Sequence, residues 1–204
     1  AFQRDWSWST TQVFSLYDSL RKQFPVGGFL LIDHSEDIPL APRLFHGVPI
    51  SDTAPMRLVL DGQQRITAGV TLLYAPDKLR YFLDLERLHE EFVEQERDLS
   101  CREDIRQFSQ DLDDGDHYLK TSKRTATDET LLLEKHFLST RHLGNTGDLQ
   151  RALEAYEATF PERGDFLKYV IVPFFAFPET NLCPVVTLDE KESLTAVTRV
   201  FTTL

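Results

Sequence analysis

The feature that most constrains this fold is the joint formed by residues 57–74, which read RLVLDGQQRITAGVTLLY. The apolar run at 57–61 predicts a buried strand, and the helical spacing that follows predicts a helix ending near Tyr74. Asp61 and Gly62 supply the turn between the two elements. The joint therefore indicates a chain built from both strands and helices.

The rest of the first 85 residues alternate in a similar way. A helix is predicted over 10–24, behind Ser9 or Thr10 as the N-cap, because its apolar residues recur at helical spacing. In the helix of the joint, Ile66, Val70 and Leu73 are expected to face inward. The predicted order is a helix at 10–24, a strand at 29–33, a proline-rich loop at 35–56, the strand and helix of the joint, and a strand at 80–85.

The remaining chain changes character. Residues 86–160 hold three helical stretches separated by polar spacers, which predicts a helical insertion or subdomain. Beyond it, apolar runs at 169–177 and 183–188 predict strands, and residues 190–204 predict a closing helix. We therefore expect a core over 1–85, a helical insertion over 86–160 and a return segment over 161–204 that completes the core.

Charge and hydropathy limit the partners. The chain carries 33 acidic and 22 basic residues, a formal net charge of −11, which opposes non-specific binding of nucleic acid over the whole surface. No apolar run is long enough to cross a bilayer and no secretion signal begins the chain, so the cytoplasm is the expected location. The chain starts without methionine and stops within a helical pattern, so we expect it to be part of a longer protein.

The start of the helix after Asp61 is a candidate anion site. Free N–H groups and the positive end of the helix dipole lie there, and Gly62 lets a ligand approach the backbone. Arg65 adds a forked cation for phosphate oxygens, and Gln63 and Gln64 could donate to a phosphate or hold a water. Asp61 could hold a hydrated magnesium ion or cap the helix amides itself.

The same five residues also have a purely structural interpretation. Asp-Gly is a common turn, and glutamine and arginine are good helix formers. The pattern is not a Walker loop, because GxxxxGK[ST] does not occur in the chain. Spacing alone therefore leaves the phosphate site and the plain turn as alternatives.

A second group of residues lies at the N-terminus, in the sequence FQRDWSW. In one interpretation Arg4 completes a two-arginine phosphate clamp beside Gln3, and a tryptophan stacks on a base. In the other, the aromatic residues Trp6 and Trp8 pack as core and Arg4 forms a surface ion pair. Both interpretations stay open at this point.

Taken in order, the segments FQRDWSW, FPVGGFLLID, LVLDGQQRITAGVTLL and LTAVTRVF resemble the N-terminal domain of the GmrSD-type restriction endonucleases. That family carries a DGQQR box, entered from a strand, downstream of a QR-aromatic segment and a proline-glycine-glycine strand. The resemblance is close over about residues 2–85 and looser over 183–204. It implies an α+β fold similar to that of ParB nucleotide-binding domains and sulfiredoxin, with a mixed sheet, flanking helices and a helical insertion.

The resemblance also implies roles for individual residues. Residues 61–65 would form the phosphate site, with Gln3 and Arg4 as its opposing wall. In that arrangement Arg65 and Arg4 neutralise phosphate charge, the helix amides at Gly62 and Gln63 cradle oxygens, Gln64 orients the attacking water and Asp61 contacts the metal. On this hypothesis Arg65→Ala should abolish nucleotide binding and leave the fold intact.

Members of this family act in defence against foreign DNA, and their NTP-binding, often NTP-hydrolysing domain controls a nuclease domain. The resemblance thus implies GTP or another NTP and Mg²⁺ as ligands, a C-terminal nuclease domain or subunit as partner, and in some systems modified DNA. The six histidines show no HNH-type context, so we expect no nuclease centre in this chain. The alternatives are a DNA-sensing module without chemistry, with Lys120, Lys123 and Arg124 as its dense basic cluster, and a scaffold that binds neither ligand.

Overall fold

The computed structural model describes residues 5–35, 44–46, 48, 53–74, 79–112, 117–123, 125–175 and 182–188. The predictions made for Gln3, Arg4, Arg124 and the closing helix lie outside these residues. The described elements, in chain order, are α1 (Thr10–Arg21), β1 (Phe29–Asp33), β2 (Arg57–Asp61), α2 (Gln63–Tyr74), β3 (Arg80–Asp84), α3 (Leu85–Glu94), α4 (Arg102–Asp111), β4 (Leu119–Ser122), α5 (Asp128–Lys135), β5 (Phe137–Ser139), α6 (Thr140–Leu143), α7 (Thr146–Thr159), η1 (Pro161–Arg163), α8 (Gly164–Phe166), η2 (Leu167–Ile171), α9 (Val172–Phe175) and β6 (Val185–Leu188).

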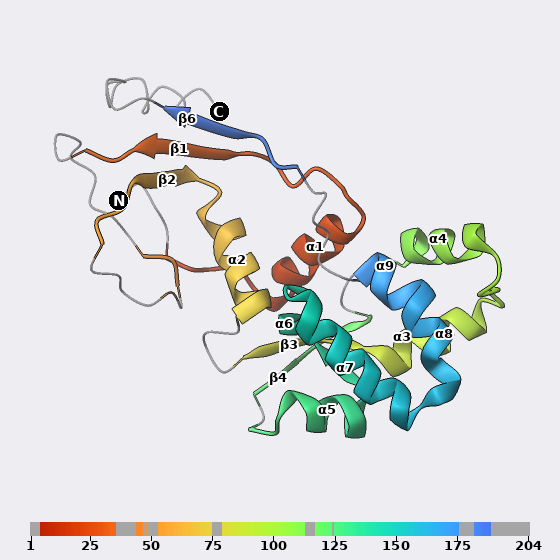
Figure 1. Ribbon diagram of the computed structural model, residues 1–204. Helices are drawn as coiled ribbons and strands as arrows, with labels where there is room; N and C mark the ends of the chain where they lie inside the picture. Colours follow the sequence, from red (N-terminus) through yellow and green to blue (C-terminus); the bar gives the residue numbers. More distant parts are fainter. Residues whose placement is uncertain are drawn as a thin grey trace.

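The strands form two separate three-stranded sheets, so the fold is α+β as expected. The first sheet has the order β2-β1-β6, with β1 antiparallel to β2 and parallel to β6. The second has the order β4-β3-β5 and is antiparallel throughout. Figure 1 shows the first sheet along the top and the second among the helices below, with α1 and α2 between them. The strands predicted at 29–33, 57–61, 80–85 and 183–188 are confirmed.

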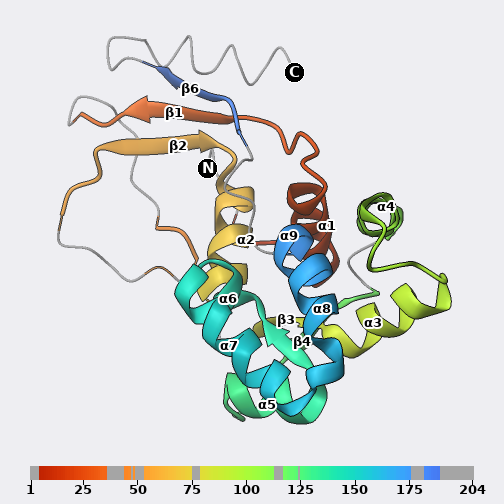
Figure 2. The same cartoon turned by 45° about the vertical axis from the view of Figure 1, so that its right-hand side comes forward.

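Most of the apolar burial lies in the helical part and the second sheet. One large core cluster joins α1, α2, the second sheet and the later helices, whereas Ile32 and Leu60 form a small separate cluster under the first sheet. The turned view in Figure 2 shows α2 descending from the end of β2 into the helical part. Thr140 fixes the far end of α2, because its hydroxyl donates to the carbonyl of Leu72 at 2.6 Å. In the described part of the chain, no helix is long and apolar enough to cross a membrane.

The buried face of α2 differs from the predicted one. Its buried residues are Thr67, Ala68, Thr71 and Leu72, while Ile66, Val70 and Leu73 are half-buried. The two threonines can be buried because each hydroxyl donates to a carbonyl four residues earlier in the helix, at 2.9 and 2.8 Å. The prediction counted only apolar residues and therefore selected the wrong face.

Two further predictions are corrected by the structure. Residues 164–175 are helical, not a strand, and the buried residues of this stretch recur at helical spacing: Phe166, Leu167, Val170, Ile171 and Phe175. A continuous apolar run cannot by itself distinguish a buried strand from a buried helix. The region 86–160 is mostly helical, but it also supplies β4 and β5, which flank β3. The left-handed conformation of His136 (φ +57°) separates α5 from β5. The pattern of residues 128–143 predicts one continuous helix across this point, as one of the three helical stretches.

Candidate functional site

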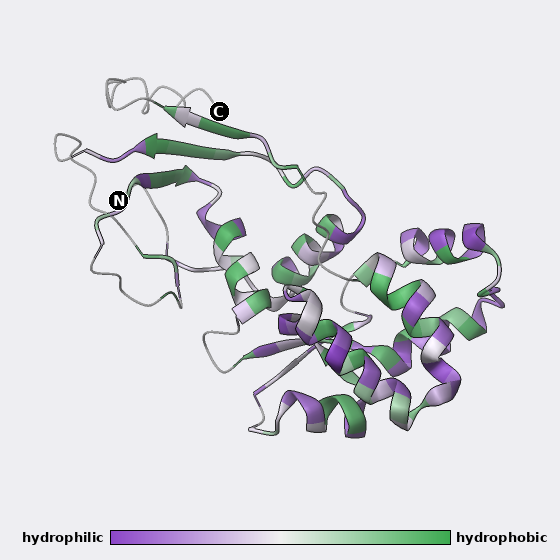
Figure 3. Cartoon of the chain, in the orientation of Figure 1, coloured by the Kyte–Doolittle hydropathy of each residue, from purple (hydrophilic) through white to green (hydrophobic). Residues whose placement is uncertain are grey.

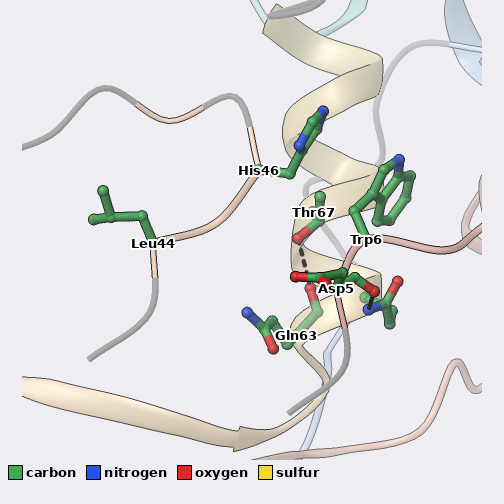
Figure 4. Close-up of a pocket in the computed structure, with 7 residues that line it drawn as sticks. Asp5, Trp6, Leu44, His46, Gln63 and Thr67 are labelled. Carbon is green, nitrogen blue, oxygen red and sulfur yellow. Dashed lines mark hydrogen bonds between the residues drawn. The ribbon is translucent and has the colours of Figure 1, made fainter. Parts of the chain in front are cut away.

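A cavity of about 290 Å³ lies beside the first turns of α2. Its lining comes from the N-terminal segment, from the loop before β2 and from α2 itself: Asp5, Trp6, Leu44, His46, Gln63, Gln64 and Thr67. Figure 4 shows Asp5 beside Thr67 at the start of α2, with Trp6 and His46 above them and the side chain of Gln63 extending to the other side. The QR-aromatic segment and the DGQQR box, more than 50 residues apart, therefore meet at one site.

Gln64 makes the connection between these two segments. Its amide oxygen accepts the backbone N–H of Ser7 at 3.2 Å, and its amide nitrogen donates to the backbone carbonyl of Asp5 at 3.1 Å. One side chain thus holds the N-terminal segment to α2 on both sides of Trp6. Gln3 and Arg4 lie outside the described residues, but they directly precede the segment that Gln64 fixes.

The first turn of α2 carries backbone donors that have no partner in the described part of the chain. Among the described residues, no acceptor meets the backbone N–H groups of Gln63, Gln64 or Arg65, and the carboxylate of Asp61 binds a guanidinium instead of capping the helix. The side-chain amide of Gln63 is half-buried in the cavity wall, with no hydrogen-bond partner in the described part of the chain. These groups are the donors that an anion at a helix N-terminus requires.

Arg65 lies on a different side of α2 from the cavity. Its guanidinium donates to the carbonyl of Val26 at 2.7 Å and to Asp61 Oδ2 at 2.9 Å, and it lies over the Phe29 ring, 5.3 Å from the centroid. The Arg65 side chain is 18% exposed and that of Asp61 is 59% exposed. The DGQQR box is thus divided between a cavity side, with Gln63 and Gln64, and a strand side, with Asp61 and Arg65.

Two glycines with positive φ complete the strand side. A Cβ at Gly27 (φ +83°) would overlap the guanidinium of Arg65, and a Cβ at Gly62 (φ +94°) would overlap the ring of Phe29. The turn before β1 and the turn before α2 are therefore packed against each other. Sequence reasoning assigned Gly62 to close ligand approach, whereas the structure gives it this packing contact.

These contacts change the expectation for Arg65→Ala. The substitution would remove a side chain that is packed against Val26, Gly27 and Phe29, as well as a positive charge. An intact fold is therefore no longer the expected result, and the variant does not isolate a binding role.

The aromatic residues of the N-terminal segment lie between the main core and the cavity. Trp6 and Trp8 are half-buried against the edge of the main core, with their centroids 6.2 Å apart, and Trp6 also lines the cavity. The exposed imidazole of His46 lies nearly parallel to Trp6, at 6.4 Å between centroids and 12° between planes. Sequence reasoning missed His46, because it belongs to a proline-rich loop 40 residues away with no local pattern.

The predicted metal contact rests on a single carboxylate. Asp61 is exposed and paired with Arg65, and the described residues contain no group of three or more histidine, cysteine or acidic side chains arranged to hold a metal ion. Magnesium usually completes its six oxygen ligands with waters and substrate phosphates. The residues present therefore fit Mg²⁺ only in company with phosphate oxygens.

Comparison with known proteins identifies the family of the chain. An uncharacterized protein of Methanocaldococcus jannaschii is 26% identical over 176 residues, covering 79% of this chain, and the chain spans about 29% of that relative. No solved structure gives a significant match. The family described as "GmrSD restriction endonuclease, N-terminal domain" matches residues 1–204. The chain therefore belongs to the family of GmrSD restriction endonuclease N-terminal domains.

Proposed function

We propose that this domain binds a nucleoside triphosphate with Mg²⁺ at the start of α2 and that nucleotide turnover there controls a nuclease elsewhere in a cytoplasmic restriction or phage-defence system. The observation that carries the proposal is the meeting of the N-terminal aromatic segment with an uncapped helix N-terminus around one cavity. A ParB-like and sulfiredoxin-like origin of the fold belongs to the same proposal.

The geometry supports a division of the ligand into two parts. A cavity of about 290 Å³ is near the lower limit for small-molecule sites, so it would take a base and not a whole nucleotide. Trp6 and His46 supply aromatic faces for stacking, and Thr67 and Gln63 supply polar groups. The phosphates would then lie over the free N–H groups of the first turn, in front of Gly62.

Arg65 and Asp61 would bind the ligand after the ion pair between them has separated. A phosphate near the helix start competes with Asp61 for the guanidinium of Arg65, which retains its bond to Val26. The carboxylate of Asp61 released in this way can bind the metal that accompanies the phosphates. Gln3 and Arg4 would face this site from the N-terminal segment.

Gln64 has a different role in this proposal from the one inferred first. Because both ends of its amide bind the backbone of residues 5 and 7, we propose that it positions the N-terminal segment. Direct orientation of an attacking water by Gln64 stays a prediction. Hydrolysis of a nucleoside triphosphate depends mainly on positioning the attacking water and stabilising the charge on the phosphates, so it needs no covalent nucleophile from the protein.

Gln63→Ala provides the cleanest test of nucleotide binding. We expect at least tenfold weaker binding of GTP, ATP or CTP with Mg²⁺, because the variant removes one donor to a charged phosphate or to the base. The side chain of Gln63 has no hydrogen bond to a described residue, so the fold should tolerate the change. Isothermal titration calorimetry measures the affinity, and release of inorganic phosphate measures turnover.

The matched control is Gln150→Ala, which removes an exposed glutamine on α7 bonded only to Glu154. Its nucleotide affinity should equal that of the wild type. If Gln63→Ala binds every nucleotide as tightly as Gln150→Ala does, the cavity side of the box is not the nucleotide site.

A second candidate function is DNA sensing, including sensing of modified DNA, through the same anion site. Binding through several phosphates weakens steeply with ionic strength, whereas a magnesium nucleotide site varies less, so a salt titration separates the two. Of the basic cluster predicted for this role, Lys120 lies in β4 and its ammonium donates to the carbonyl of His117 at 3.4 Å. A scaffold without ligands would bind neither probe.

A further inference from the structure

A second concave site lies between the end of α1 and α4. It is a groove of about 500 Å³, and it shares no lining residue with the cavity beside α2. Its lining is polar or charged throughout: Arg21, Lys22, Gln23, Arg102, Glu103, Arg106, Ser109 and Gln110. Four of these eight residues are cations and one is an anion, in a chain whose net charge is −11.

A buried arginine fixes the shape of this groove. The Arg21 side chain is 1% exposed, donates to the hydroxyl and the carbonyl of Ser109 in α4, and is paired with Asp18 in its own helix at 2.6 Å. Tyr118 donates to the same carboxylate at 2.6 Å, and Lys22 approaches it at 3.0 Å. These bonds tie α1 to α4, so the groove is preformed.

The cations on the α4 side are not used by the fold. Arg102 and Arg106 lie one turn apart on the exposed face of α4, which is largely hydrophilic (Figure 3). Neither makes an ion pair or a hydrogen bond with any described residue. Two like charges at this spacing repel each other, and Glu103 is the single acid in the lining. An anion bound between the two guanidinium groups would relieve this repulsion.

We propose that this groove is a second anion site, which binds a phosphate-bearing ligand between Arg102 and Arg106. Guanidinium groups match phosphate oxygens with forked pairs of hydrogen bonds, and two of them one helical turn apart can bind adjacent phosphates. The lining contains no apolar side chain, which disfavours a docked protein segment, because protein interfaces usually place apolar or aromatic anchors at their centre. The inference does not depend on the nucleotide site beside α2.

The test uses two phosphate probes with the whole chain. Binding of a fluorescein-labelled 20-base-pair DNA duplex is followed by anisotropy, and binding of tripolyphosphate is followed by calorimetry, for the wild type and for the double variant Arg102→Ala/Arg106→Ala. We expect at least tenfold weaker binding by the variant. For the duplex, the slope of log K against log salt should fall by about 2 in magnitude, one for each phosphate that the variant no longer neutralises.

The matched control is the double variant Arg87→Ala/Arg151→Ala, which removes the same charge from a partly exposed position on α3 and an exposed position on α7. Equal decreases in affinity for the two double variants, or no binding of either probe by the wild type, would overturn the proposal. Binding of both probes supports a site for free phosphates, and binding of the duplex alone supports a nucleic-acid backbone. Poly-glutamate that competes as strongly as tripolyphosphate would show that the groove does not select phosphate.

Discussion

Replacement of Gly62 by alanine is expected to destabilise the domain by about 2–4 kcal/mol and to abolish nucleotide binding beside α2. The backbone of Gly62 has φ +94°, which an L-residue adopts with strain, and the new Cβ would overlap the ring of Phe29. Relief of that overlap would move β1 or the start of α2, where the free N–H groups lie. Urea denaturation measures the free energy of unfolding, and calorimetry with GTP, ATP and CTP measures binding.

Gly69→Ala is the matched control in the same helix. A Cβ at Gly69 meets no atom within 4 Å, so alanine should stabilise the domain by about 0.5–1 kcal/mol through its higher helix propensity. If packing against Phe29 explains the effect, the free energy of unfolding should decrease for Gly62→Ala and increase for Gly69→Ala. If both variants change the free energy of unfolding in the same direction and to the same extent, the contact between Gly62 and Phe29 does not carry the effect.

The largest loss of stability is expected for Arg21→Met, at about 3–5 kcal/mol. Methionine keeps much of the apolar stem but removes the cation, which leaves the largely buried Asp18 and the partners in Ser109 without their guanidinium. Urea denaturation at pH 7 measures the change. Arg151→Met, at a side chain that is 74% exposed, should change the free energy of unfolding by less than about 1 kcal/mol.

The same network predicts how stability depends on acid pH. Burial acts to raise the pKa of Asp18, but hydrogen bonds from Tyr118 and Arg21 outweigh it, so the pKa lies below its ordinary value. A carboxyl whose pKa is lower in the folded state stabilises the fold above its unfolded pKa, about 3.9, and this contribution is lost as the pH falls through the folded pKa. Urea denaturation at a series of pH values should therefore show that the free energy of unfolding of the wild type falls below about pH 4. The Asp18→Asn variant should not show this decrease. If the free energy of unfolding falls with acid pH in the same way in both proteins, Asp18 is not the group responsible.

Local patterns predicted the elements around the DGQQR box because each carries its own signal. Ser9 and Gln12 form a capping box at the start of α1, and the turn at Asp61 and Gly62 separates β2 from α2. The strand β5 has three residues and lies directly after the left-handed His136, so its identity depends on pairing with β3. Helix α4 carries only Ile105 and Phe108 as apolar residues and was not predicted. Such elements are defined by tertiary contacts, which no short sequence window contains.

The sequence could nominate residues for a candidate site, but it could not predict how they are arranged. Gln64 of the box binds the backbone of Asp5 and Ser7, and the roles predicted for Gln3 and Arg4 stay predictions. The division of the box could not be read from spacing, because the side of α2 that Arg65 takes depends on contacts with Val26 and Phe29, more than 30 residues earlier. His46 entered the cavity lining from a loop without any periodic signal.

The pairing of β1 also has a consequence for protein synthesis. β1 pairs with β2 soon after both are made, but its other edge pairs with Val185 and the residues that follow, more than 150 residues later. At about 5–20 residues per second, the ribosome needs roughly 8–30 s to produce the intervening chain. During that time the strand FLLID keeps one edge of free N–H and C=O groups, which is a template for pairing with other nascent chains. The central strand of the first sheet is therefore among the first elements made and acquires its second partner only near the end of the described chain.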